Sequence, residues 1–432
     1  FLFIFIGKKM HDIKNKINKA INDNKDEIIA FVQELVRTPS LANQESDVQK
    51  IIHNKLNSIG LNSKIIPVIF SELEHHPAFN DDGFSADSRI NVTTVWKGKN
   101  NAKSLILNGH VDVVPIGPEK LWDDDPFSGN IIDGKIYGRG SCDMKAGLSS
   151  GLFAISILKY LGFVPDGDII FQSVVGEESG GCGTLTNIVK GYNADAAIIL
   201  EPTSLKLSPI QSGALTFRLK VLGKATHASM RWDGISAIEK YSLIHQSIIN
   251  FEKERHDSFD VEYYQSKDRV APINIGTIEG GQWHSTVPES IIAEGRLGVF
   301  PGESNAKARQ CFEDHINKFT QSDNWLKDHP PVIEWFEGQF ESGQTSLDHP
   351  LIKELGKTYT NVSNQDAIIE GVTYGSDLRL FTNHANIPSV LFGPGDVRLA
   401  HAANENIPIS EILISTEVIA NMIVNWCGGN FE

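Results

Sequence analysis

The sequence predicts an α/β protein built on a mostly parallel β-sheet with helices on both faces. Short apolar runs of strand length at 104–107, 168–175 and 194–200 alternate with helical patterns at 144–161 and 184–189. This alternation of strand and helix is typical of a parallel sheet that is covered on both sides. In such sheets ligands bind beyond the carboxyl ends of the strands. We therefore expect the functional residues at that edge.

A second, smaller domain is predicted inside the first, because 432 residues are too many for one ordinary hydrophobic core. After Gly213 the pattern changes to two strand-helix-strand groups, which indicate a small α+β domain with helices on one face of its sheet. The chain is expected to return to the main domain after Val332 and Ile333. The predicted parts are a first catalytic segment at 10–210, an insertion at 211–338 and a second catalytic segment at 339–432.

The N-terminal region predicts one amphipathic helix over 14–37. Met10 is a candidate translation start, and residues 1–9 are set aside as uninformative. The formal net charge of −15 argues against nucleic acid and anionic membranes as partners. No stretch is long and apolar enough for a membrane span. The 4 cysteines show no paired pattern, which favours a reducing compartment, and we expect a cytoplasmic protein.

His110 and Asp112 follow the apolar run 104–107, with one residue between them. Alternate residues of an extended segment face the same side, so both side chains would emerge together. An imidazole there can bind a metal through one nitrogen while a carboxylate orients the other nitrogen. For these residues alone, a buried structural histidine beside a solvated aspartate is an equally good interpretation.

Further polar residues at the predicted strand ends favour the metal-binding interpretation of His110 over the structural one. His110 and three carboxylates could form a two-metal site together with a histidine late in the chain. The five candidate ligands are His110, Asp143, Glu178, Glu201 and His401. Two imidazoles and three carboxylates suit Zn²⁺, and also Mn²⁺ or Co²⁺. Without cations these carboxylates would repel one another strongly. Glu177 would then be the general base that takes a proton from water, although a solvated acidic pair is the common fate of such a dipeptide.

Three segments carry a resemblance to a known family: NGHVDVVP at 108–115, GRGSCDMKAG at 138–147 and GEESGG at 176–181. They resemble the dinuclear zinc hydrolases of the acetylornithine deacetylase, succinyl-diaminopimelate desuccinylase and aminoacylase family, which implies a zinc-exopeptidase-like catalytic domain. The resemblance implies that Asp143 bridges two metals, with a cis peptide bond after it. It further implies His110 and Glu201 on one metal, Glu178 and His401 on the other, Glu177 as general base, and Asp112 as the partner of His110.

The resemblance also gives the insertion a role, as a lid that usually pairs two subunits in a homodimer. His227 matches the histidine that stabilises the oxyanion, whereas taken alone it would more often be structural. Asn274 and Arg296 lie where family members contact substrate. Arg379 and Arg398 are candidate carboxylate anchors, with a surface position as the alternative for either. Residues 375–377, Gly-Ser-Asp, depart from the family pattern and affect the substrate pocket.

The predicted activity is metal-dependent hydrolysis of a small acyl group, acetyl or formyl, from an N-acylated amino acid or related amine. Acetylornithine deacetylase is the default within the family, and an N-formyl aminopyrimidine deformylase is an alternative. The sequence is also compatible with a di- or tripeptidase, a carboxypeptidase, or a non-catalytic binding protein on the same fold. The G-x-S-x-G pattern at 147–151 begins a predicted helix and lacks the preceding strand of a serine nucleophile elbow.

Overall fold

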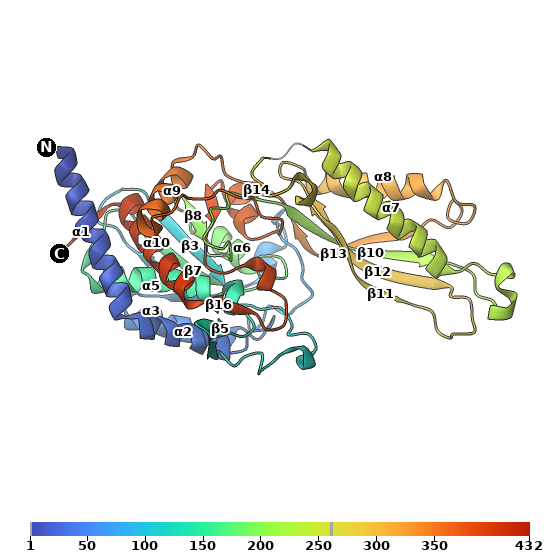
Figure 1. Cartoon of the computed structure of the whole chain (residues 1–432), viewed down its shortest axis with the longest axis horizontal. Helices are drawn as coiled ribbons and strands as arrows, with labels where there is room; N and C mark the ends of the chain where they lie inside the picture. The colour runs from blue at the N-terminus through green and yellow to red at the C-terminus, as the bar shows by residue number, and fades with distance from the viewer. Residues whose placement is uncertain (1, 260–261) are drawn as a thin grey trace. The chain divides into compact units, whose positions relative to one another are not determined.

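The structure is a computed structural model that describes residues 2–259 and 262–432, and these residues form two compact units (Figure 1). The first unit contains the chain up to Pro209 together with Gln344–Glu370 and Ser376–Glu432. The second unit contains Ile210–Gly343 and Gly371–Gly375. Its main segment extends past residue 338, the predicted end of the insertion, because strand β13 (Val332–Phe340) runs beyond that point.

The first unit is built around a six-stranded sheet with the order β1-β2-β7-β3-β8-β15. Its strands are β1 (Lys64–Pro67), β2 (Ile90–Trp96), β3 (Leu105–His110), β7 (Ile169–Val174), β8 (Ala197–Ile199) and β15 (Ser389–Leu391). Its longer helices are α1 (Leu2–Asp23), α2 (Lys25–Arg37), α3 (Ser46–Ser58), α5 (Ala146–Tyr160), α6 (Cys182–Val189), α9 (Pro350–Ser363) and α10 (Ile409–Cys427). The neighbours β7, β3, β8 and β15 are parallel, while β2 runs antiparallel to both β1 and β7.

Two consecutive residues of β3 show that helices cover both faces of this sheet. The Asn108 side chain donates a hydrogen bond of 3.0 Å to the hydroxyl of Thr184 on α6. A Cβ atom at Gly109 would lie 2.9 Å from the side chain of Leu148 on α5. Because consecutive strand residues face opposite sides, α5 and α6 lie on opposite faces. The predicted fold class, a mainly parallel α/β sheet with helices on both faces, is therefore confirmed.

The helix predicted over 14–37 is in fact two helices, α1 and α2, which meet at Asn24. The backbone of Asn24 leaves the helical region, with φ −106° and ψ 13°. Its side-chain amide donates to the carbonyl of Ala20 at 2.7 Å. Asparagine competes with the helix through such local hydrogen bonds, and the apolar periodicity on either side conceals the break.

The second unit has a four-stranded antiparallel sheet of order β11-β12-β10-β13, with α7 and α8 on one face (Figure 1). Its elements are β10 (Gly213–Leu222), β11 (Ile273–Gly280), β12 (Ser290–Val299), β13 (Val332–Phe340), α7 (Ala237–Ser258) and α8 (Asn305–Thr320). Phe217 packs against Phe312 in its core, with ring centroids 4.8 Å apart. The expected return to the main domain at Val332 is wrong, because Val332 begins β13, which pairs with β10.

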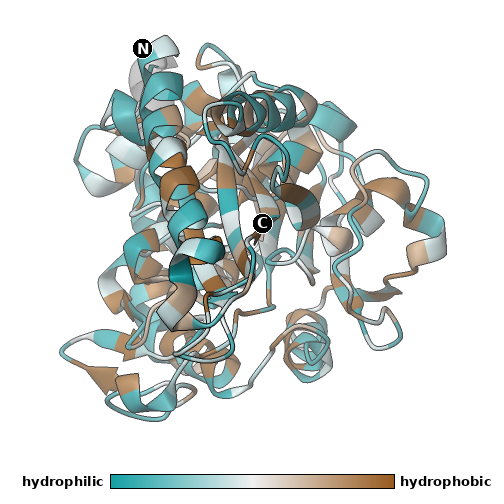
Figure 2. Cartoon of the chain, turned by 90° about the vertical axis from the view of Figure 1, so that its right-hand side faces the viewer, coloured by the Kyte–Doolittle hydropathy of each residue, from teal (hydrophilic) through white to brown (hydrophobic). Residues whose placement is uncertain are grey.

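The peripheral helices carry hydrophilic (teal) and hydrophobic (brown) residues side by side, as amphipathic helices do (Figure 2). Among the residues described, no helix combines the length and apolar character that crossing a bilayer requires. All four cysteines, Cys142, Cys182, Cys311 and Cys427, are free thiols.

Candidate metal centre

Three adjacent parallel strands of the first unit place polar side chains at one edge of the sheet. His110 is the last residue of β3 and pairs with Val174, the last residue of β7. Glu177 and Glu178 follow β7 within four residues. Asn108 pairs with Ile199 on β8, so Glu201 follows at the level of His110. The carboxyl ends of these strands therefore bring His110, Glu177, Glu178 and Glu201 together.

Asp143 lies between two histidines and presents one carboxylate oxygen to each. Its Oδ1 atom is 3.1 Å from Nε2 of His110, and its Oδ2 atom is 3.5 Å from Nε2 of His401. Nε2 of His401 also lies 3.2 Å from Oε1 of Glu178, and Nε2 of His110 lies 3.9 Å from Oε1 of Glu201. The peptide bond between Asp143 and Met144 is cis. Asp143 thus lies between His110, which also faces Glu201, and His401, which also faces Glu178.

The second ring nitrogen of His110 is held by the backbone carbonyl of Asp112, with the Asp112 carboxylate nearby. Nδ1 of His110 is 2.9 Å from the carbonyl oxygen of Asp112 and 3.7 Å from Oδ1 of its carboxylate. Only the first of these distances is that of a hydrogen bond, so the carbonyl accepts the Nδ1 proton. The Asp112 carboxylate instead accepts a hydrogen bond of 3.1 Å from the backbone N–H of Glu178. Asp112 therefore connects the segment of His110 to that of Glu178.

The buried carboxylates shift one another's proton affinities. Burial, followed by the charge of Glu201, raises the pKa of Glu177 well above its usual range. Burial, followed by the charge of Asp143, raises the pKa of both Glu178 and Glu201. Burial would lower the pKa of His110, but the nearby carboxylates, Asp143 first, raise it well above its usual range. These shifts all reflect excess negative charge in a buried space.

This donor set fits divalent cations. Ligand atoms of His110, Glu177 and Glu201 all lie within 4.8 Å of one another, and so do those of His110, Asp143 and Glu178. Oε1 of Glu177 is buried and has no hydrogen-bond partner among the residues that the structure describes. A cation would neutralise the mutual repulsion of these carboxylates and supply the missing electrostatic partner. The side chain of His401 remains 54% exposed, so the group is open on that side.

Three predicted site residues belong to the second unit. Asn274 on β11 and Arg296 on β12 lie directly opposite each other in the antiparallel pair, so the structure brings these two together. Nη2 of Arg296 donates to the carbonyl of Thr373 at 3.2 Å. His227 is exposed, and its Nδ1 atom lies 2.8 Å from the hydroxyl of Ser229. The first unit alone forms the strand-end cluster, which consists of His110, Asp143, Glu177, Glu178, Glu201 and His401.

The two candidate anchors differ in their surroundings. Arg379 is 1% exposed, and its Nη2 atom donates a 2.8 Å hydrogen bond to the carbonyl of Gly180, beside the Glu177–Glu178 pair. Arg398 is exposed, and its Nε atom lies 2.9 Å from each carboxylate oxygen of Asp396. Both guanidinium groups thus bond to groups of the protein itself.

Two further residues bear on the interpretation of the sequence, Asp377 and Ser149. Asp377 is fully buried, and its charge contributes to the raised pKa of Glu177 and Glu201. Its only sequence signal is the departure from the family pattern at 375–377. Ser149, the serine of the G-x-S-x-G pattern, is buried inside α5 and donates to the carbonyl of Lys145 at 2.7 Å. A helical serine that donates to the fourth preceding carbonyl is an ordinary structural hydroxyl.

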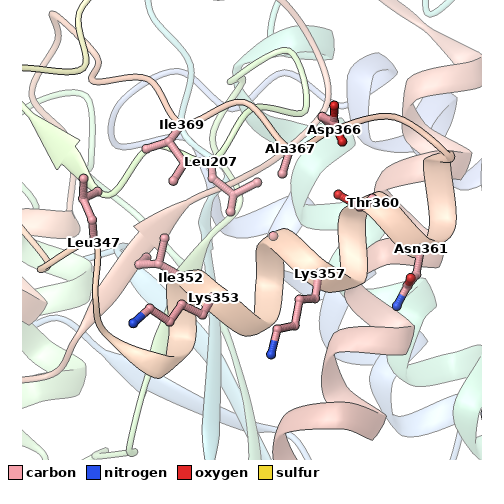
Figure 3. A pocket seen from close by; sticks show the side chains of 11 residues that line it. Leu207, Leu347, Ile352, Lys353, Lys357, Thr360, Asn361, Asp366, Ala367 and Ile369 are labelled. Carbon is pink, nitrogen blue, oxygen red and sulfur yellow. The ribbon is translucent and has the colours of Figure 1, made fainter.

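A separate concavity of about 620 Å³ lies along α9 in the first unit (Figure 3). Leu207, Ile352 and Ile369 form an apolar wall there, whereas Lys353 and Lys357 point away from these residues in Figure 3. None of the predicted site residues lines this pocket. This pocket is therefore distinct from the strand-end cluster.

Residues 106–425 match the family model described as peptidase family M20/M25/M40. The chain belongs to this family. The matched region contains every residue of the strand-end cluster, from His110 to His401. The protein is accordingly a metal-dependent amidohydrolase that acts on a small molecule, and the strand-end cluster is its candidate metal site.

Individual relatives of this M20 protein differ in the reaction that their names describe. It is 30% identical to an N-formyl-4-amino-5-aminomethyl-2-methylpyrimidine deformylase of Bacillus subtilis, over 96% of this chain and 98% of that protein. It is 25% identical to a probable succinyl-diaminopimelate desuccinylase of Staphylococcus epidermidis, over 87% of this chain and 92% of that protein. A di-peptidase structure from Saccharomyces cerevisiae shares the fold, with a TM-score of 0.76, 16% identity, and coverage of 96% and 98%.

Proposed function

We propose that this M20 protein is an N-deformylase that hydrolyses a small N-formylated amine of the aminomethylpyrimidine class and releases formate and the free amine. The observation that carries the proposal is the 30% identity to a deformylase of that class, which extends over almost the whole of both chains. Identity to the desuccinylase is lower, at 25%, and covers less of the chain. Formyl is also one of the two acyl groups that the sequence predicts.

We further propose that the centre holds two divalent cations, with Zn²⁺ preferred and Co²⁺ or Mn²⁺ as substitutes. Imidazole and carboxylate donors without thiolates suit these metals. Asp143 would bridge the pair, because its two oxygens face different histidines. His110 and Glu201 would hold one cation, and Glu178 and His401 the other. When bound, the cations would polarise the amide carbonyl and make water at the site more acidic.

The chain's own residues would then carry the proton transfers. Glu177 would accept a proton from the water that attacks the formyl carbon, and would deliver it to the amine nitrogen as the C–N bond breaks, leaving formate and a free amine. The Oε1 atom of Glu177 is buried and has no hydrogen-bond partner within 2–259 and 262–432, which supports this role. Asp112 would orient His110, and His227 would stabilise the oxyanion. Asn274, Arg296 and Arg379 remain proposed substrate-binding residues.

The test is hydrolysis of a substrate panel by protein that has been stripped of metal and then reloaded with Zn²⁺, Co²⁺ or Mn²⁺. The panel contains the N-formyl aminomethylpyrimidine, N-succinyl-diaminopimelate, N-acetylornithine and a dipeptide, with Glu177→Gln as the control. We expect metal-restored release of formate, at least tenfold above turnover of the other substrates. Preferential release of succinate, acetate or an amino acid would reject the deformylase and identify the actual substrate class instead. Turnover that survives complete stripping would reject the metal centre.

We also propose that the protein is a cytoplasmic homodimer formed through its second unit. β11 is an edge strand of that unit's sheet, and its Ile278 is 54% exposed. Ile238 and Ile249 on α7 are likewise half exposed. An open strand edge with exposed apolar side chains is suited to pairing with a second copy. Sedimentation of the wild type and of Ile278→Lys tests this, and a monomeric wild type would reject it.

A further inference from the structure

We propose that Arg139 and Glu405 form a positioning pair that fixes three ligand-bearing segments of the metal centre. Both side chains are buried, at 2% and 1% exposure, and Nη1 of Arg139 lies 2.6 Å from Oε2 of Glu405. Neither residue is a candidate ligand, and their function as a pair rests on the metal centre proposed above. Each end of the pair contacts a different part of the backbone around that centre.

The carboxylate of Glu405 holds the backbone that carries Asp143. Its Oε1 atom accepts hydrogen bonds from the backbone N–H of Cys142 at 2.9 Å and from that of Asp143 at 3.0 Å. Its Oε2 atom faces Arg139. Hydrogen bonds from peptide N–H groups to a buried carboxylate are charge-assisted and therefore strong. They fix the peptide groups on the N-terminal side of Asp143, whose carboxylate lies between His110 and His401.

The guanidinium of Arg139 reaches two further segments. Its Nη1 atom donates to the carbonyl of Ala402, the residue after His401, at 3.2 Å. Its Nη2 atom donates to the carbonyl of Pro115, on the loop that follows His110, at 3.2 Å. The planar guanidinium offers its donors in a fixed arrangement, so these carbonyls are held at set positions relative to Glu405.

The pair therefore connects the segments of His110, Asp143 and His401 with one buried ion pair. Arg139 neutralises Glu405, so the pair adds no net charge to the carboxylates of the centre. Removing cations from the centre leaves the pair intact, since none of its hydrogen bonds involves a ligand side chain. We infer that the pair preorganises the metal-free centre and so strengthens metal binding.

Glu405→Gln is the discriminating variant, because glutamine has the same shape but only one acceptor atom. Glu405 uses both oxygens as acceptors, one for Arg139 and one for the two peptide N–H groups. In either orientation of the amide, the NH₂ group of glutamine would face a donor. Whichever way the side chain turns, the variant loses either the contact with Arg139 or the hydrogen bonds from the two peptide N–H groups.

The matched control is Glu303→Gln in the second unit. Glu303 is also a buried glutamate, with its Oε2 atom 2.6 Å from Nη2 of the buried Arg255 and 3.1 Å from the backbone nitrogen of Phe300. Like Glu405, it combines a buried ion pair with a peptide hydrogen bond, and it belongs to the unit that contributes nothing to the strand-end cluster. Both contacts of Glu303 are made by Oε2, so the carbonyl oxygen of glutamine can keep them, and the variant removes only the buried charge beside Arg255. The loss of this charge should lower thermal stability without affecting the metal centre.

The experiment is a titration of the metal-free full-length proteins with Co²⁺, followed by visible absorption and by calorimetry, together with the melting temperature of each metal-free protein. We expect Glu405→Gln to weaken Co²⁺ binding about 10- to 100-fold and to change the absorption spectrum. We expect Glu303→Gln to bind Co²⁺ as the wild type does. Equal affinity and an unchanged spectrum in Glu405→Gln, with a lowered melting temperature in both variants, would overturn the positioning role.

Arg139→Lys keeps the proposal testable if Glu405→Gln does not fold. Lysine keeps the charge beside Glu405 but lacks the planar guanidinium, which donates to the carbonyls of both Pro115 and Ala402. We expect this variant to weaken Co²⁺ binding by a smaller factor than Glu405→Gln, whereas wild-type affinity would contradict the proposal. A wild type that binds no Co²⁺ would overturn the proposed centre itself and the positioning role with it.

Discussion

The hydroxyl of Ser179 donates a hydrogen bond of 2.5 Å to the carboxylate of Asp82, which is buried beside Arg89. Ser179 directly follows Glu177 and Glu178, so this contact holds one side of their loop. We predict that Ser179→Ala lowers kcat about tenfold and changes KM little, because Glu177 is displaced while the Asp82–Arg89 ion pair remains. Ser179→Thr keeps the hydroxyl and should restore the rate. Steady-state kinetics of both variants decide this, and an unchanged kcat in Ser179→Ala would contradict it.

Glu177 and Glu178 are neighbours with different expected roles. Glu177→Gln should lower kcat by about 10²- to 10⁴-fold, the usual contribution of a general base, and should leave metal content close to that of the wild type. Glu178→Gln should instead reduce the metal content. Metal analysis of the purified variants, combined with turnover, separates these two losses. Ser149→Ala is the control and should retain activity, because that hydroxyl is buried and donates to the backbone carbonyl of Lys145, one turn earlier in the chain.

Metal binding should release protons. Burial and mutual repulsion raise the pKa of Glu177, Glu178 and Glu201 in the metal-free protein, and a bound cation would favour their charged forms and so displace protons from them. Calorimetry of Zn²⁺ binding in buffers of different ionisation enthalpy measures the number released. We also expect a cation at 100 times its Kd to stabilise the fold by about 2.7 kcal/mol. Binding without proton release would contradict the charge assignment.

Glu45 should make the wild type less stable as the pH rises. Burial, followed by the charge of Asp112, raises the pKa of Glu45 to about 7, although Arg89 lies 3.8 Å away. The folded state therefore binds this proton more tightly than the unfolded chain, and the resulting stability is present below about pH 4.5 and lost as the pH rises to about 7. Over this pH range the unfolding free energy of Glu45→Gln should therefore fall by up to about 3 kcal/mol less than that of the wild type.

Denaturant unfolding of metal-free wild type and Glu45→Gln across this pH range provides the measurement. The difference in unfolding free energy between the two proteins should change steadily in favour of the variant as the pH rises. A constant difference would show that Glu45 does not titrate in this range.

The sequence identifies much of the candidate site because several of its residues lie at strand ends and follow apolar runs. His110, Glu177, Glu178 and Glu201 each come just after such a run, and the parallel order β7-β3-β8 brings them together. His401 could not be placed this way, because it lies in a loop after a short 3₁₀ helix. Its assignment depends on the family resemblance and on the long-range contact with Glu178.

Other features leave no periodic signal. The burial of β13 follows no strict alternation, so its start at Val332 is easily taken for a connecting segment. Arg139 and Glu405 are separated by 266 positions, and only the fold shows that they pair. Sequence patterns reveal residues by their local surroundings, whereas such buried ion pairs are determined by topology.

The glycines of the G-x-S-x-G pattern have a consequence for the spacing of the centre. A Cβ atom at Gly147 would lie 1.9 Å from the carbonyl oxygen of Leu200, and one at Gly151 would lie 2.7 Å from the side chain of Leu200. Leu200 immediately precedes Glu201, and α5 begins just after Asp143. The approach of the segments that carry Asp143 and Glu201 is therefore limited by the contact between Gly147 and the backbone of Leu200, which side-chain repacking cannot relieve. A single methyl group at Gly147 would force these two segments apart, although Gly147 is not itself one of the proposed ligands.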